Sequence, residues 1–344
     1  MFWELFTSYL LEQVLTTKRY ILETTTTVFN DTFASDIIEG LSSTPKFLSS
    51  KYFYDEKGDA IFQQIMEMPS YYLTRSEYQI FDTHKKALLQ LFGPDCTPFH
   101  LVEFGAGDGL KTKVLLQHFI EQKACFRYLP IDISENVLSL LTHDLEMKFP
   151  TLEVEPLAND YFEALNILNQ REQNERKVIL FLGSNIGNFE HEQAIGFLQK
   201  MRQHLNPNDL LLIGFDLKKD PAVILEAYND KEGITRSFNL NLLDRMNKEF
   251  GGNFDTTKFR HNPTYNPLTG ATKSYLVSTE DQVVTLEKLG KSFHFEAWEA
   301  IDMEISQKYS LSTIQHLAEQ AGFQVTSNFF DKNKYFVDSV WSVK

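Results

Sequence analysis

Between residues 100 and 217, short apolar stretches alternate regularly with longer amphipathic ones. The apolar stretches have the length and composition of buried strands, and the stretches between them repeat apolar residues at helical spacing. This pattern is typical of a parallel sheet that is covered by helices on both faces. It predicts strands over residues 100–104, 126–133, 152–157, 177–183 and 209–217, and helices over residues 111–122, 135–149, 161–170 and 190–205.

The regular pattern stops after Lys219 and returns near the C-terminus. Residues 269–288 have the pattern of antiparallel strands, and residues 310–323 that of a helix, followed by strands over 324–330 and 334–341. We therefore predict an α/β sheet domain, completed by one antiparallel strand and interrupted by an inserted second α+β lobe. The predicted bounds are residues 75–218 and 308–344 for the sheet domain, residues 26–74 and 219–307 for the second lobe, and residues 1–25 for an N-terminal extension.

Charge and cysteine content limit the classes of partner. The chain of 344 residues has 33 basic and 47 acidic residues, a net charge of −14, which argues against nucleic acid or an anionic membrane as the main partner. Cys96 and Cys125 suit a reducing compartment and have no metal-ligand spacing. The apolar N-terminus contains Glu4 and Glu12 and no preceding basic residue, unlike a signal peptide. We expect a cytoplasmic monomer that acts on a small molecule without a metal.

A glycine-rich loop follows the first predicted strand, in the sequence "LVEFGAGDGLKTK". A loop between a strand and a helix presents backbone N–H groups to a ligand at the carboxyl edge of the sheet. The Gly-Lys-Ser/Thr of a P-loop is absent, and Leu110 breaks the dinucleotide pattern G-x-G-x-x-G. Asp108 would also repel a pyrophosphate. The loop therefore favours a ligand with a cationic centre and no phosphate, such as S-adenosylmethionine (SAM).

Acidic residues follow the next two predicted strands. Asp132 stands where a carboxylate can accept both ribose hydroxyls, and Asp160 where a carboxylate can accept from the adenine amine, with Tyr161 and Phe162 beside the ring. Each feature alone is also typical of a tight turn or a helix cap. Three such features on successive strands predict a SAM site.

A second group of polar residues suggests an amino-acid substrate. In "AIDMEISQKY", strand alternation places Glu304 and Ser306 on one face, where a carboxylate and a hydroxyl can serve the two nitrogens of an imidazole. Asn188, in "GSNIGN", can donate to a carboxylate and accept from an amine. From these residues alone, a solvated strand face and an ordinary turn remain open alternatives.

Six longer sequence segments resemble those of a known family. They are "YFYDEKGDAIF", "YYLTRSEYQI", "YLPIDISENVL", "LFLGSNIGNFE", "LEAYNDKEGITRSFNLNLLDRMNKEF" and "MEISQKY". In these segments the chain, from about residue 46 to its C-terminus, resembles the histidine-specific SAM-dependent methyltransferases of the ergothioneine pathway. The resemblance implies a class I methyltransferase domain with a Rossmann-like sheet and an inserted lobe. It also implies transfer of three methyl groups to the α-amino nitrogen of histidine, giving the betaine hercynine.

The resemblance also implies site residues at the matching positions, to which Tyr161 is added from its place beside Asp160. The residues expected to bind SAM are Gly105, Ala106, Gly107, Lys111, Asp132, Asp160 and Tyr161. The residues expected to bind the substrate are Tyr54, Tyr71, Gly183, Asn188, Tyr228, Glu304 and Ser306, and Tyr54 and Asn188 are also expected to act in catalysis.

The chain departs from the family pattern in two places. The loop reads "GAGDG" where the family usually has Gly-Ser-Gly-Thr-Ser, and Ser274 stands where a methionine is expected beside the imidazole. The second departure leaves room for another substrate. The alternatives are an N-methyltransferase of another small aromatic amino acid or amine, and a non-catalytic SAM-binding protein that docks a partner.

Overall fold

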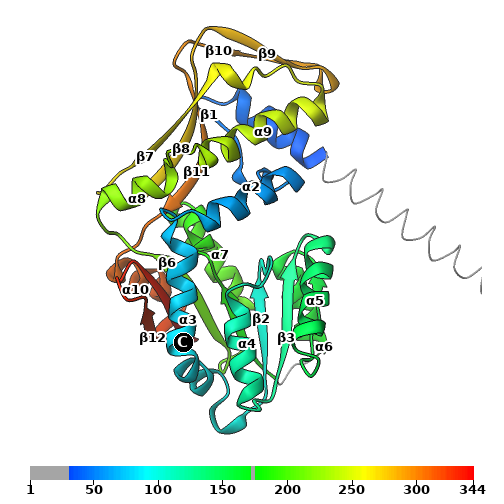
Figure 1. Ribbon diagram of the computed structural model, residues 1–344, viewed down its shortest axis with the longest axis vertical. Coiled ribbons are helices and arrows are strands. Elements are labelled where there is room, and N and C mark those ends of the chain that lie inside the picture. The colour runs from blue at the N-terminus through cyan, green and yellow to red at the C-terminus, as the bar shows by residue number, and fades with distance from the viewer. Residues whose placement is uncertain (1–30, 172–174) are drawn as a thin grey trace, which may run out of the picture. The chain divides into compact units, whose positions relative to one another are not determined.

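The computed structural model describes residues 31–171 and 175–344 (Figure 1). The predicted extension over residues 1–25 lies outside the described residues. The chain divides into two compact units, whose bounds differ from those expected from the sequence; that expected division stays a prediction. Of the described residues, unit 1 contains those up to Gln63, with Glu232–Asn262 and Ser274–Glu304, and unit 2 contains those within Gln64–Lys231, Pro263–Lys273 and Ile305–Lys344.

Unit 2 is built on a seven-stranded sheet with the order β12-β13-β6-β5-β2-β3-β4. Strands β4, β3, β2, β5 and β6 are parallel, and β13 runs antiparallel to both β6 and β12. This confirms the predicted fold class, an α/β sheet domain of mostly parallel strands completed by an antiparallel strand. The strands are β2 (Phe99–Phe104), β3 (Phe126–Asp132), β4 (Leu157–Ala158), β5 (Arg176–Phe181), β6 (Leu210–Asp216), β12 (Phe323–Phe330) and β13 (Phe336–Val343).

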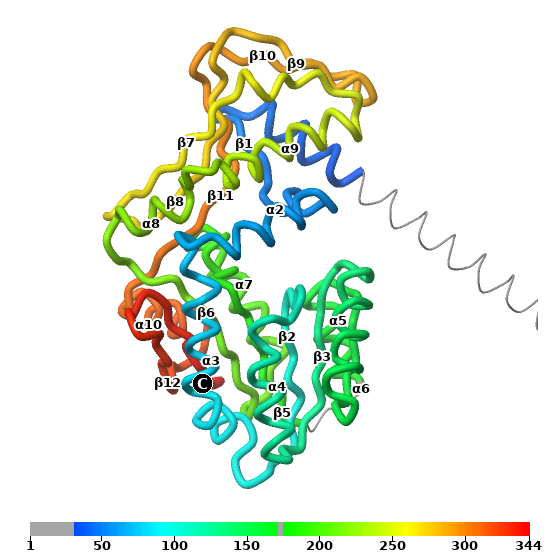
Figure 2. The backbone as a smooth tube through the Cα atoms, in the orientation of Figure 1, coloured from blue at the N-terminus to red at the C-terminus, as the bar shows by residue number. Residues whose placement is uncertain are grey.

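Seven helices of the described chain contribute to the two apolar cores that pack on the faces of this sheet, as the chain trace in Figure 2 helps to follow. The helices that share a core with one face are α3 (Tyr72–Phe92), α4 (Thr112–Glu121), α5 (Glu135–Lys148) and α8 (Pro221–Tyr228). Those that share a core with the other face are α6 (Tyr161–Arg171), α7 (His191–Gln203) and α10 (Leu311–Gln320). Since both faces are covered, the central strands are buried along almost their whole length and are mostly apolar rather than alternating.

The register of the central strands sets the position of the site. Phe104, at the end of β2, pairs with Ile131 of β3 and with Phe181 of β5. The carboxyl ends of three neighbouring strands therefore lie at one edge of the sheet. Ligands of open α/β sheets bind at this edge.

One strand prediction was wrong in detail. The third strand, expected over residues 152–157, forms only at Leu157–Ala158, with an isolated bridge between Tyr128 and Val154. Pro156 has no N–H to donate, which prevents a continuous ladder there. The strands expected over residues 269–288 exist, but they enter different sheets because the chain bends after Ser278.

Unit 1 is an α+β unit. Strands β1, β11, β8 and β7 form one sheet in that order, and β9 pairs with β10 in another; the ends of β7, β8 and β11 belong to unit 2. Phe33, in the helical residues 31–42, stacks on Tyr52 at 4.1 Å and meets Phe250 edge-on at 5.1 Å. The elements are β1 (Lys46–Phe47), α2 (Glu56–Glu67, which continues into unit 2), α9 (Ile234–Phe250), β7 (Phe259–Tyr265), β8 (Ala271–Ser278), β9 (Gln282–Leu286), β10 (Lys291–Phe295) and β11 (Ala300–Gln307).

A carboxyl group lies inside the apolar layer of unit 2. Glu103 of β2 is buried and accepts hydrogen bonds from Thr112 Oγ1, at 2.7 Å, and from the Tyr128 hydroxyl. Burial raises the pKa of Glu103 to about 7, although the two hydrogen bonds oppose this shift. Its ordinary pKa is 4.5, so the folded protein retains this proton over a range where the unfolded chain loses it.

We therefore expect Glu103 to make unit 2 less stable as the pH rises from about 4.5 to 7. A carboxyl group whose pKa is higher in the folded protein than in the unfolded chain stabilises the fold fully at low pH. This contribution to the free energy of unfolding, here at most about 3 kcal/mol, is lost as the pH rises through the folded-state pKa. Glu103→Gln should flatten this dependence and be more stable than the wild type at pH 8. Urea unfolding of both proteins at pH 5 and pH 8 measures it; an unchanged pH dependence in the variant would refute the assignment.

Candidate active site

The glycine loop connects β2 to α4 at the carboxyl edge of the sheet. Gly105 and Gly107 have φ values of 66° and 54°, in the left-handed region that disfavours other residues. A Cβ on Gly105 would also lie 3.1 Å from the Tyr161 hydroxyl oxygen, whereas one on Gly107 would meet nothing within 4 Å. Gly105 is thus required by both conformation and space, and the backbone at Gly107 is open to a ligand.

The two predicted acids lie at the ends of the neighbouring strands. Asp132 ends β3, and its Oδ1 accepts the Ser134 N–H at 3.0 Å. Asp160 precedes α6, and its Oδ1 accepts the Phe162 N–H at 3.0 Å. Each carboxylate therefore caps the turn that follows it. A carboxylate can accept about four hydrogen bonds, so a capping role still leaves acceptor capacity for a ligand.

Tyr161 lies next to the glycine loop and to the two acidic residues. Its ring stacks on Phe104 with centroids 4.5 Å apart and an interplanar angle of 5°. Burial, helped by the charges of Asp132 and Asp160, raises the pKa of Tyr161 to about 12. The phenol therefore keeps its proton and offers a neutral donor beside Gly105. The structure thus brings together Gly105, Asp132, Asp160 and Tyr161.

Lys111, at the N-terminus of α4, pairs with Glu77 of α3, a buried residue that the sequence analysis missed. Glu77 also accepts the Gly183 N–H, at 2.9 and 3.0 Å from its two oxygens. Burial disfavours the charged form of Lys111, but the Glu77 carboxylate holds its pKa above the ordinary value. One buried carboxylate therefore ties the glycine loop to the loop after β5. Its signal in the sequence is an acid at an apolar position of α3, between Leu73 and Ile80.

The loop after β5 has two consecutive left-handed residues, Gly183 with φ 72° and Ser184 with φ 58°. Such a conformation costs energy at a non-glycine residue and is held by its surroundings; here Ser184 Oγ accepts the Asp216 N–H at 3.1 Å. Asn188 ends the following 3₁₀ helix and is exposed. Asn185, which the sequence analysis did not select, places its side-chain amide within 4 Å of where a Cβ would stand on Gly105 and on Gly183.

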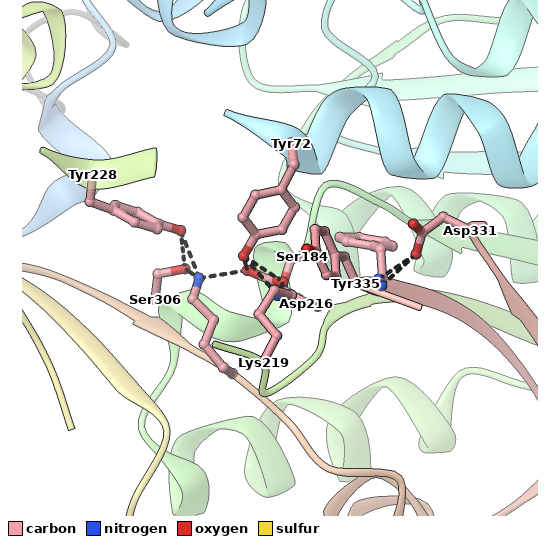
Figure 3. A network of polar contacts seen from close by, with 10 residues as sticks. Tyr72, Ser184, Asp216, Lys219, Tyr228, Ser306, Asp331 and Tyr335 are labelled. Carbon is pink, nitrogen blue, oxygen red and sulfur yellow. Dashed lines mark hydrogen bonds and ion pairs between the residues drawn. The ribbon is translucent and has the colours of Figure 1, made fainter. Parts of the chain in front are cut away.

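Asp216, a buried residue at the end of β6, interacts with several hydrogen-bond donors (Figure 3). Asp216 accepts from the Tyr72 hydroxyl, at 2.8 and 3.0 Å from its two oxygens, and from Lys308 Nζ at 2.9 Å. Lys219 forms a second ion pair with it. Burial lowers the pKa of Lys219 to about 8, although the Asp216 carboxylate opposes this shift. Asp216 and Lys308 were not among the predicted site residues.

Two predicted substrate residues join this network. The Tyr228 hydroxyl donates to Ser306 Oγ at 2.8 Å (Figure 3). Lys308 Nζ donates to both of these hydroxyls, each at 2.7 Å. Tyr71 meets the Tyr228 ring edge-on at 6.5 Å. Tyr71, Tyr228 and Ser306, which are far apart in the sequence, are therefore neighbours in unit 2.

The remaining residues singled out in the sequence belong to unit 1. Tyr54 is 45% exposed and packs edge-on against Phe62 and Phe238. Glu304 is half-buried on β11, and Ser274 is buried on β8.

Within residues 31–171 and 175–344, no three His, Cys, Asp or Glu side chains are grouped as metal ligands. In the same part of the chain, no helix combines the length and apolar character needed to cross a bilayer. Cys96 and Cys125 are both exposed free thiols.

Comparison with known proteins agrees with this geometry. Residues 33–343 match the family model described as histidine-specific methyltransferase, SAM-dependent. The histidine N-alpha-methyltransferase of Mycolicibacterium smegmatis is 32% identical over 291 residues, covering 85% of this chain and 88% of that protein. Ergothioneine biosynthesis protein 1 of Schizosaccharomyces pombe is 32% identical over 82% of this chain and 37% of its own length.

A more distant relative has another named substrate. The 4-dimethylallyltryptophan N-methyltransferase of Claviceps purpurea is 24% identical over 206 residues, covering 58% of this chain and 59% of that protein. The family model, by contrast, spans almost the whole described chain. The chain therefore belongs to the histidine-specific, SAM-dependent methyltransferase family, and its cofactor is S-adenosylmethionine.

Proposed function

We propose that this protein transfers methyl groups from SAM to the α-amino nitrogen of L-histidine, up to three times, giving the trimethylated betaine hercynine. The observation that carries the proposal is the environment of Ser306. This buried residue accepts hydrogen bonds from Lys308 and Tyr228, and it lies on β11, the strand that also contains Glu304. A buried polar side chain of this kind suits a substrate with a polar ring. The names of the mycobacterial and yeast relatives support the same substrate and pathway.

The SAM-binding roles follow from the carboxyl edge of the sheet in unit 2. Asp132 accepts from the ribose hydroxyls and Asp160 from the adenine amine, while Tyr161 lines the cofactor beside Gly105. The open backbone at Gly107 supports a close approach of the ligand. Ala106 and Lys111 complete the loop at the N-terminus of α4, where N–H groups favour a carboxylate.

The substrate roles are divided between the head group and the ring. Asn188 holds the carboxylate and amine, and Gly183 shapes the same loop. Glu304 accepts from one ring N–H and Ser306 serves the other nitrogen. Tyr71 and Tyr228 line the substrate; because the Tyr228 proton is donated to Ser306, the contribution of Tyr228 is mainly its ring and its hold on Ser306.

SAM supplies a methyl group that is already activated by its sulfonium. The protein must present an unprotonated amine in line with that methyl group and exclude water, so positioning provides most of the rate. The α-amino group is largely protonated at neutral pH, and a proton must leave before each transfer. We propose Tyr54 as the relay for this proton and Asn188 as the residue that orients the amine.

We further propose that residues 75–218 and 308–344 act as the SAM-binding domain and residues 26–74 and 219–307 as the substrate lobe. We also propose that the protein works as a cytoplasmic monomer. Two exposed free thiols support a reducing compartment.

A substrate competition tests the proposal. Equal amounts of histidine, tryptophan, tyrosine and phenylalanine are incubated with the protein and SAM, and the products are identified by mass spectrometry. We expect methylated histidine almost alone, because a site that hydrogen-bonds a ring leaves its own polar groups unpaired with phenylalanine. Methylation of only a non-imidazole amino acid would overturn the histidine assignment, and no methylation despite SAM binding would favour a non-catalytic, partner-binding role.

One observation favours a second candidate, an N-methyltransferase of another aromatic amino acid. Ser274 is buried where a larger apolar residue was expected, and the Claviceps relative is named for a tryptophan derivative. A smaller side chain at this position gives a larger ring more room. The tryptophan arm of the competition decides between the two candidates.

A further inference from the structure

Lys308, a buried cation, has no role of its own in the proposed reaction. It donates hydrogen bonds to Tyr228 and Ser306, which are both proposed to bind the substrate. Its side chain is fully buried, and Nζ donates to Asp216 Oδ2 at 2.9 Å, to the Tyr228 hydroxyl at 2.7 Å and to Ser306 Oγ at 2.7 Å. An ammonium group has three N–H donors. All three are used within the protein, so Lys308 acts on a ligand only through these neighbours.

These contacts fix the hydrogen-bonding role of Ser306. A hydroxyl oxygen accepts two hydrogen bonds and donates one. Ser306 Oγ accepts one from Lys308 and one from the Tyr228 hydroxyl, at 2.7 and 2.8 Å. Both acceptor positions are therefore occupied, and Ser306 can only donate to a further partner.

Tyr228 cannot relax this constraint. Its single proton is donated to Ser306, and its oxygen accepts from Lys308. Asp216 in turn holds Lys308 in place, since it is fully buried and also bound by Tyr72 and Lys219. Lys308 thus donates to Tyr228, and Tyr228 donates to Ser306, so the hydrogen bonds of this chain all point toward Ser306.

We infer that Lys308 is a specificity-determining positioning residue that holds the Ser306 hydroxyl as an obligate donor toward an unprotonated ring nitrogen of the substrate. A neutral imidazole provides such an acceptor, whereas an imidazolium or a benzene ring does not. The inference rests on the proposed function for the identity of the ring. It adds that the buried lysine, and not the serine alone, determines which ring is accepted.

A double-mutant cycle tests the inference. Lys308→Met, Ser306→Ala and the double variant are compared with the wild type by calorimetric binding of histidine in the presence of S-adenosylhomocysteine. If Lys308 acts through Ser306, each single change weakens histidine binding by about 10- to 100-fold, and the double variant is only about as weak as either one. Losses that multiply in the double variant would overturn the inference.

A second ligand separates positioning from general damage. Binding of 3-(2-thienyl)alanine, which has a five-membered ring without nitrogen, should change by no more than about twofold in Lys308→Met. Equal losses for both amino acids would indicate a merely structural role and contradict the inference. Lys177→Met is the matched control, since it removes another buried ammonium of unit 2, one that pairs with Asp209 at 3.0 Å and lies outside the Asp216 network; its ring preference should match the wild type.

Two further measurements keep the result interpretable. The SAM affinity of each variant reports whether unit 2 is folded. If Lys308→Met fails to fold, Tyr228→Phe takes its place in the cycle, because the loss of the Tyr228 hydroxyl frees one acceptor position of Ser306. Failure of the proposed function is distinguishable, because the wild type itself would then not bind histidine. Histidine binding by the wild type with independent losses in the cycle would overturn the inference alone.

Discussion

Asp132→Asn should weaken SAM binding by roughly 1–3 kcal/mol, which is about 5- to 150-fold in Kd. The carboxylate stands at the end of β3, where it can accept from both ribose hydroxyls, and one of its oxygens already caps the following turn. An amide keeps the size of the side chain but replaces one acceptor by a donor and removes the charge. Isothermal calorimetry with SAM and with S-adenosylhomocysteine measures the loss.

The matched control is Glu135→Gln, which removes the same charge from an exposed position three residues later. Exposed charges at this distance are screened by water and salt, so SAM affinity should stay within about twofold of the wild type. Unchanged affinity in Asp132→Asn would remove Asp132 from the cofactor site. Equal losses in both variants would point to a general charge effect instead.

Asn188→Ala should raise the KM for the amino-acid substrate by about 10-fold or more and leave the Kd for SAM close to that of the wild type. The side-chain amide can donate to the substrate carboxylate and accept from its amine, and alanine removes both contacts. Asn188 is exposed at the end of its 3₁₀ helix, so the change should cost little stability. Steady-state kinetics with varied amino acid, together with calorimetry for SAM, separate the two effects.

Asn333→Ala, in the connection between β12 and β13, is the control for loss of an asparagine side chain. It should leave both parameters near the wild-type values. If Asn188→Ala turns over the substrate normally, the loop after β5 is only a turn. The head group would then have to be held by other residues.

The sheet of unit 2 was predictable because its signal is local. Buried parallel strands are mostly apolar and alternate with amphipathic helices, and Asp132 and Asp160 were selected because they stand at or just after the ends of predicted strands. The third strand was misplaced because residues 152–157 are apolar enough for a strand, while Pro156 interrupts its ladder. The separate sheets of β8 and β9 depend on pairing with distant strands, which a local pattern does not encode.

The supporting residues of the site escaped prediction for a related reason. Glu77 meets Gly183 across 106 residues, and Lys308 meets Tyr228 across 80. A charged residue inside an apolar pattern indicates that a buried partner exists, but it does not identify the partner. Ser306 could be named from its place in the segment "MEISQKY", whereas the contacts of Lys308, which stands in the same segment, became evident only from the geometry.

The most direct test of the central claim follows the fate of the methyl group. The protein is incubated with L-histidine and SAM that carries a trideuterated methyl group, and the products are resolved over time by tandem mass spectrometry. We expect one, two and then three labelled methyl groups, all retained on the fragment that contains the α-nitrogen. Label on the imidazole ring, or no transfer to histidine by protein that binds SAM, would contradict the account.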